Sequence, residues 1–200
     1  ALAFLDQLLL ATSALAGFAM DDMTRDDGWR FLIIGRRIER LIFLADAIAQ
    51  FLRLESTRAP GCVEWLLELA DSIITYRSRY MAQPELLPAI DLIVLDGANP
   101  HAVLFQAQTL TRYLGRLERE LGSLPGEAGG DALRAGLDRL RTFDLDRFDD
   151  RASPARRNGG VRELAGLLDG LAQDAANLSD RLAMRYFTHV GDVGRQTLAA

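Results

Sequence analysis

Charged side chains interrupt an apolar helical pattern at residues 36–40, Arg-Arg-Ile-Glu-Arg, and are the first candidates for chemistry. A partly buried Glu39 would need a charged or multiply hydrogen-bonded partner, because desolvation penalises an isolated charge. It could act as a general base while Arg36 and Arg40 hold a substrate carboxylate. The same spacing also suits a solvated charge ladder, or a buried ion pair that sets helix register. The pattern alone leaves these alternatives open.

A second candidate is the segment Tyr-Arg-Ser-Arg-Tyr at residues 76–80, which sets two tyrosines one helical turn apart with arginines between them. Such a group could bind an anionic or peptide ligand, or supply the partner for Glu39. It could equally be an ordinary amphipathic helix edge. The predicted polar cluster lies between the second and third helices and comprises Arg36, Glu39, Arg40, Tyr76, Arg77, Arg79 and Tyr80.

The segment Asp-Gly-Ala-Asn-Pro at residues 96–100 has the composition of a turn. Asp96 and Asn99 are explained by turn chemistry, with Asn99 as the N-cap and Pro100 as the first residue of the next helix. His101 and His189 lack metal-ligand spacing, and Cys62 is the only cysteine. We therefore expect no metal and no cofactor.

The elements that must position these residues are helices. In the segment 25–54, apolar residues recur every three or four positions, and the same signal covers 1–20, 62–82, 100–122, 130–143 and 161–188. Thr24 is the predicted N-cap of the second helix. The segment 85–96 is a short apolar helix with Pro88 in its first turn, or a lone strand. The sequence predicts an all-α, up-and-down bundle of about six helices.

Length and composition indicate one globular domain over residues 1–190, with an exposed loop at 144–160 and a flexible tail at 191–200. The net charge of −5 argues against a nucleic-acid-binding surface. Residues 1–20 are apolar enough to raise the question of a membrane span or signal peptide, but the segment lacks a basic n-region, and Asp6 and Gln7 interrupt the apolar run. We interpret this segment as a buried amphipathic helix and expect a cytoplasmic protein that does not enter a membrane.

Four segments resemble, in this order, the bacterial alpha-E domain, an all-α domain named for its ER motif. They are "MTRDDGWRFLIIGRRIERLIFLAD", "TYRSRY", "DLIVLDGANPHAVLFQ" and "LSDRLAMRYFTH", and the motif falls on Glu39 and Arg40. Members usually have Arg-Ser after the Asn-Pro pair, where this chain has His101-Ala102. A full family domain also has a further N-terminal segment, so this chain resembles its C-terminal two-thirds.

The resemblance implies a functional context. Alpha-E domains accompany, or are fused to, circularly permuted ATP-grasp proteins, and they occur beside transglutaminase-like and proteasome-like peptidases. That company implies amide or peptide-bond formation. We therefore expect a non-catalytic accessory domain that docks an ATP-grasp ligase or its peptide substrate. The alternatives are an enzyme that uses Glu39 as a general base, and a structural domain in which the ER cluster sets helix register.

Overall fold

The computed structural model describes residues 2–54, 59–122, 129–148 and 153–187. The described chain is helical throughout and contains no strand, which confirms the predicted all-α fold. Its elements in chain order are α1 (Leu2–Asp21), α2 (Asp27–Arg53), α3 (Cys62–Leu69), α4 (Ile73–Tyr80), α5 (Leu86–Ile90), a π-helix (Asp91–Leu95), α6 (Val103–Leu121), α7 (Gly129–Arg141), a 3₁₀ helix (Leu145–Phe148) and α8 (Pro154–Tyr186).

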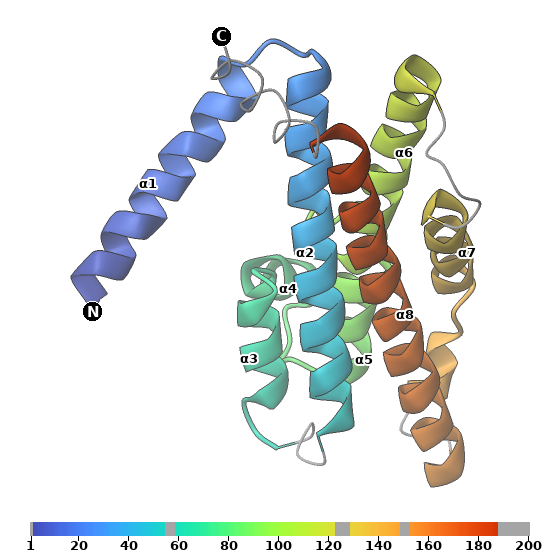
Figure 1. Ribbon diagram of the computed structural model, residues 1–200. Helices are drawn as coiled ribbons and strands as arrows, with labels where there is room; N and C mark the ends of the chain where they lie inside the picture. Colours follow the sequence, from blue (N-terminus) through green and yellow to red (C-terminus); the bar gives the residue numbers. More distant parts are fainter. Residues whose placement is uncertain (1, 55–58, 123–128, 149–152, 188–200) are drawn as a thin grey trace, which may run out of the picture.

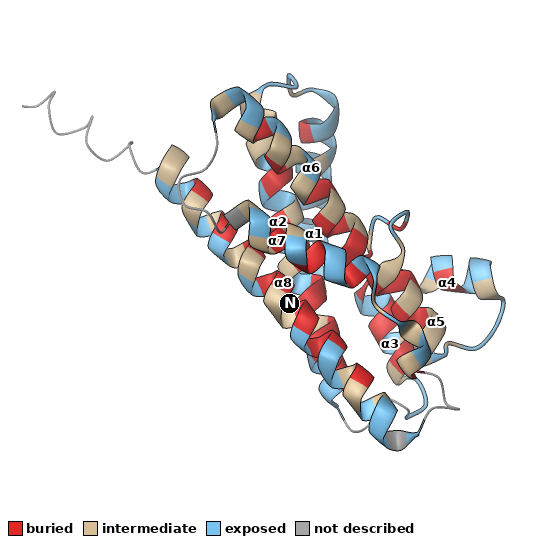
Figure 2. Cartoon of the chain, turned by 90° about the vertical axis from the view of Figure 1, so that its right-hand side faces the viewer, coloured by how far each residue is buried: buried red, intermediate tan, exposed pale blue. Residues whose placement is uncertain are grey.

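Helix α2 is the centre of the bundle and packs mainly against α8 and α6, while α7 covers the outer faces of these two helices (Figure 1). The apolar positions that predicted α2 form its buried face, including Ile34, Ile38, Leu41, Ala45 and Ile48. Each fully buried large aliphatic side chain contributes roughly 1.5–3 kcal/mol of transfer free energy. Figure 2 shows buried residues following the inner sides of the helices.

Helix α2 is capped by Asp26, so the prediction that Thr24 is the N-cap is wrong. A carboxylate oxygen of Asp26 accepts a hydrogen bond of 3.0 Å from the backbone N–H of Trp29. Both residue types are favoured at this position, and only the backbone geometry selects between them.

The helix predicted over residues 62–82 is in fact two helices, α3 and α4. The chain breaks at Asp71, which takes a left-handed conformation with φ of 49°, and at Ser72, which is fully buried. The Ser72 hydroxyl donates a 3.1 Å hydrogen bond to the carbonyl of Ala70. Asp tolerates the left-handed region better than most residues, but neither Gly nor Pro marks this break in the sequence.

The segment 85–96 is helical, as α5 followed by the π-helix, rather than a strand. Pro88 is the third residue of α5, where its missing N–H leaves no intrahelical bond unmade. Helix α6 begins at Val103 with Ala102 as its N-cap. The prediction that Asn99 is the N-cap is therefore wrong. Its buried side chain has another role, which is described below.

The segment 144–160 was predicted to be an exposed loop, but most of its described residues are helical. Phe148 of the 3₁₀ helix is buried, and α8 already begins at Pro154, where the hydroxyl of Ser153 accepts a hydrogen bond from the Arg156 N–H. Gly160 lies inside α8. A Cβ there would come within 2.8 Å of the Cβ of Arg147, so this position leaves room only for glycine. Gly160 therefore reflects helix packing rather than a loop.

Helix α1 leaves the bundle and extends away from it (Figure 1). Of its residues only Ala19 is buried, so the prediction of a buried helix is wrong for this chain. Among the described residues, α1 is the one helix long and apolar enough to cross a membrane by length and composition. The predicted tail at 191–200 lies outside the described residues.

Candidate functional site

An open cleft of about 840 Å³ runs along the exposed side of α2 from Gly28 to Leu44. Its other walls are Ala70 and Asp71 in the α3–α4 turn, His101 before α6, and Phe187 after α8. The ER motif lies on its floor, and we call it the ER cleft. Three of the four segments that carry the family resemblance line it, namely those containing the ER motif, His101 and Phe187.

Arg37 ties the ER motif to the turn before α6. One of its terminal nitrogens donates a 3.0 Å hydrogen bond to the side-chain carbonyl of Gln106, and the Gln106 amide in turn donates to the carbonyl of Pro100. Gln106 is fully buried, and the Arg37 guanidinium lies 5.6 Å from the centre of the Phe105 ring. Burial, followed by the nearby Arg40 and Arg36, lowers the pKa of Arg37.

Arg37 was not among the residues predicted to form the polar cluster. A signal was present, because Arg37 lies three or four positions from Ile33, Ile34 and Leu41, all of which are buried. Helical neighbours at that spacing share a face. Arg37 is thus the arginine of the segment 36–40 that reaches the edge of the core.

Glu39, Arg36 and Arg40 are exposed, and within the described part of the chain their side chains make no hydrogen bond or ion pair. Several arginines elsewhere form ion pairs, among them Arg30 with Glu120, Arg53 with Asp169, and Arg134 with Glu118. The buried ion pair and the general-base hypothesis both depended on a partly buried Glu39. Its exposure contradicts that premise.

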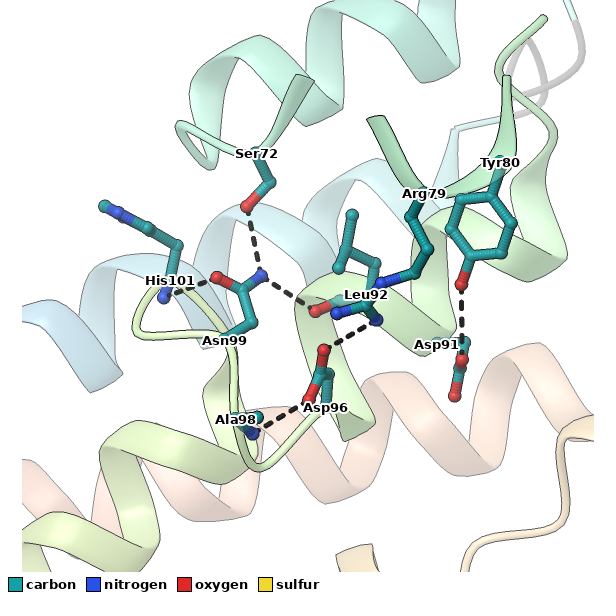
Figure 3. Close-up of polar contacts among 9 residues, drawn as sticks. All are labelled: Ser72, Arg79, Tyr80, Asp91, Leu92, Asp96, Ala98, Asn99 and His101. Atoms are coloured by element: carbon teal, nitrogen blue, oxygen red, sulfur yellow. Dashed lines mark hydrogen bonds and ion pairs between the residues drawn. The ribbon is translucent and has the colours of Figure 1, made fainter. Parts of the chain in front are cut away.

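The sequence predicted one cluster of the ER motif with the tyrosine and arginine side chains of α4. In the structure these α4 side chains have other partners. Arg77 pairs with Glu64, and Arg79 pairs with Asp96 at 2.7 Å (Figure 3). The Tyr80 hydroxyl lies 3.5 Å from a carboxylate oxygen of Asp91, and burial raises the pKa of Tyr80. These contacts join α4 to α3 and to residues 91–96.

Tyr76 is the buried member of that segment. Its hydroxyl accepts a 3.0 Å hydrogen bond from the backbone N–H of Glu85 and donates to the carbonyl of Gln83 at 3.4 Å. Its ring centre lies 4.7 Å from that of Tyr80. The segment 76–80 therefore holds the chain before α5 in place, on contacts separate from the ER cleft.

Asn99 links three segments through its amide (Figure 3). Its nitrogen donates to the Ser72 hydroxyl at 3.2 Å and to the Leu92 carbonyl at 3.0 Å, and its oxygen accepts from the His101 N–H at 3.1 Å. The structure places Asp96, Asn99 and Pro100 together in a turn, in which Asp96 accepts from the Ala98 N–H at 2.8 Å. Asn99 thereby fixes the position of His101 at the edge of the ER cleft.

The ER cleft combines apolar side chains with charged ones. Its floor alternates apolar side chains, among them the half-exposed Phe43, with the unpaired charges of the motif. At its edge, His101 lies 3.6 Å from a carboxylate oxygen of Asp71. Across the described residues, no three His, Cys, Asp or Glu side chains converge as metal ligands would. Such a surface can accept a partner with an apolar face and complementary charges.

Comparison with known proteins gives a consistent result. The family model Alpha-E, described as a predicted alpha-helical domain with a conserved ER motif, matches residues 1–187. Uncharacterized proteins of Mycobacterium bovis and Mycobacterium tuberculosis are each 27% identical over 180 residues, covering 88% of this chain. The chain spans 19% of the length of these curated relatives. No solved structure matches.

Proposed function

The chain belongs to the Alpha-E family, and we propose that it is a non-catalytic docking domain for an ATP-grasp type amide or peptide ligase in the bacterial cytoplasm. In this proposal the ER cleft receives the ligase, or the peptide substrate that the ligase modifies. Transglutaminase-like and proteasome-like peptidases of the same system are further candidate partners.

The observation that carries the proposal is the unmatched charge in the ER cleft. Arg36, Glu39 and Arg40 stand without partners in the described chain, beside the exposed apolar side chains of Leu32 and Phe43. Unpaired charges around an apolar centre are what a complementary protein surface uses to select its partner and to set its orientation.

Gly35 supports the same conclusion. It lies inside α2, where Gly costs about 1 kcal/mol relative to Ala, and a Cβ built there would have no atom within 4 Å. The described chain itself therefore gives no packing reason for a glycine. Close approach of a partner to the floor of the ER cleft would supply one.

The architecture of the relatives also fits a domain that works with other parts. In the mycobacterial proteins the matched region is only 19% of the length, so most of each chain lies outside it. An exposed Glu39 without an oriented acid–base partner gives no comparable support to catalysis by this domain. The docking role is the better explanation of the site.

Calorimetry with the cognate ATP-grasp protein tests the proposal. The double variant R36E/R40E should bind at least tenfold more weakly, with a reduced salt dependence, because it reverses the charge that faces the partner. Arg119→Glu is the matched control, since Arg119 is exposed on α6 and donates only to the carbonyl of Gly115. Absence of binding by the unmodified chain, with and without nucleotide, would refute the docking role.

Gly35→Ala separates binding from stability. The added methyl group should raise the free energy of unfolding by about 0.5–1 kcal/mol, since nothing in the described chain opposes it. It should also weaken ligase binding, because it fills the floor of the ER cleft. A more stable variant that binds normally would show that the partner does not approach Gly35.

A further inference from the structure

Helix α1 exposes more apolar surface than an isolated monomer ordinarily does. Nine of its large apolar side chains are exposed, including Phe4, Leu15 and Phe18, each of which is more than half exposed. A side chain of this size offers on the order of 200 Å² when fully exposed, so α1 presents about 1,000 Å² of apolar surface. The largest patch on a typical monomer is about 300–600 Å², whereas each partner of a stable complex contributes about 800 Å².

This surface is concentrated on one side of α1. At 3.6 residues per turn, eight of the nine exposed side chains fall on an arc of about 200° of the helix circumference, and Leu10 lies opposite the middle of that arc. The opposite half carries Asp6, Gln7, Ser13 and Asp21. A helix with one apolar half is built to pack against another protein element through that half.

One seam on the apolar side of α1 has residue types that read the same in both directions. Its residues are Phe4, Leu8, Ala11, Leu15 and Phe18, at steps of four, three, four and three. This is the spacing at which two helices interlock side chains along their length. An inverted copy can be placed so that Leu8 of each helix lies opposite Ala11 of the other, and the same contact is then made twice, as a two-fold interface requires.

We propose that the chain forms a dimer in which α1 packs antiparallel against α1 of a second copy. In this register Phe4 lies opposite Leu15 of the second copy, and Leu8 lies opposite its Ala11. Each large side chain of the central layers then meets a small one. The acidic residues Asp6 and Asp21 stay on the outer side of the helix pair, where their charges remain in water.

The charge pattern favours a second copy over a lipid surface. Helices that lie on membranes carry Lys or Arg on their polar face, whereas the charged residues of α1 are both acidic. The proposal goes beyond the docking function and concerns a different surface. Variants in the ER cleft should leave the dimer intact, and variants in the seam should leave the ER cleft intact.

Sedimentation equilibrium of the chain tests the proposal. The unmodified chain should have twice the mass of one copy at micromolar concentration. The double variant L8E/L15E should raise the dissociation constant by roughly 100-fold or more, because it places charge inside the seam. Leu10→Glu is the control, since Leu10 is 71% exposed on the same helix but faces away from the seam. Thermal unfolding of the three proteins should coincide, because α1 has little contact with the bundle.

Cysteine cross-linking tests the orientation, with Cys62 replaced by Ser. The double variant F4C/L15C should form a disulfide-linked dimer, because these positions face each other across an antiparallel pair. F4C alone should not, since two copies of residue 4 would be about 16 Å apart along the pair, beyond the reach of a disulfide. A monomer at all concentrations, equal effects of L8E/L15E and L10E, or recruitment of a monomer to lipid vesicles through α1 would each overturn the proposal.

Discussion

Replacing Asn99 by Ala tests whether its amide holds three segments together or merely shapes a turn. The substitution removes two donated hydrogen bonds, to Ser72 and to the carbonyl of Leu92, and one accepted from the N–H of His101. Asn99 and Ser72 are both buried, so water cannot readily replace the lost bonds. We expect the protein to fold with a lower free energy of unfolding.

The magnitude follows from those three bonds. Each contributes about 1 kcal/mol net, and a buried carbonyl left without a donor adds a desolvation cost of about 1–3 kcal/mol. The Leu92 carbonyl belongs to the π-helix, in which the following residues Ile93 and Val94 are also fully buried. We therefore expect Asn99→Ala to lower the free energy of unfolding by about 4–6 kcal/mol, measured by urea denaturation followed by circular dichroism.

Asn99→Asp distinguishes the two interpretations. A turn requires only an acceptor, and Asp supplies one to the His101 N–H as well as Asn does. The link between segments requires the two hydrogen-bond donors of the Asn99 amide, which a carboxylate lacks. The Asp side chain would also place a negative charge against the Leu92 carbonyl. Asn99→Asp should therefore destabilise at neutral pH at least as much as Asn99→Ala. A loss below about 1 kcal/mol for both variants would refute the linking role.

Three further substitutions test the packing of α7 and α8 and the turn before α6. Gly136→Ala should lower the free energy of unfolding by about 1–3 kcal/mol, because a Cβ there would lie 2.7 Å from a leucine side chain of α8. Gly166→Ala should instead raise it by about 0.5–1 kcal/mol, because no atom lies within 4 Å of a Cβ at that position. Urea unfolding measures both changes. Burial by itself would raise the pKa of Asp96, but hydrogen bonds from the Ala98 N–H and from Arg79 outweigh it and lower the pKa. A lowered folded-state pKa means that the stabilisation by Asp96 is fully present above its unfolded pKa of about 3.9 and is lost as the pH falls through the folded value. The deficit of Asp96→Asn should accordingly be constant between pH 5 and 7 and shrink below pH 4; a deficit that does not change with pH would contradict this assignment.

Local sequence determined where most helices lie, because side-chain periodicity and capping act within a few residues. The apolar repeat through Ile34, Ile38 and Leu41 specified both the existence of α2 and its buried face. The same repeat put the ER motif on a single helix. Resemblance of separated segments, ending with the one that contains Phe187, identified the family, which the match over residues 1–187 confirmed.

Tertiary structure decided which side chains meet, because a helical pattern states which face is apolar and not what covers it. Arg37, rather than Glu39, reaches the edge of the core, because Gln106 of α6 accepts its hydrogen bond there. The break at Asp71 depends on contacts that no local signal encodes. Helix α1 has an apolar face typical of a buried helix, yet the rest of the described chain covers almost none of it. Burial depends on every element that packs against a helix. A sequence pattern can therefore indicate that a helix face needs a partner without identifying that partner.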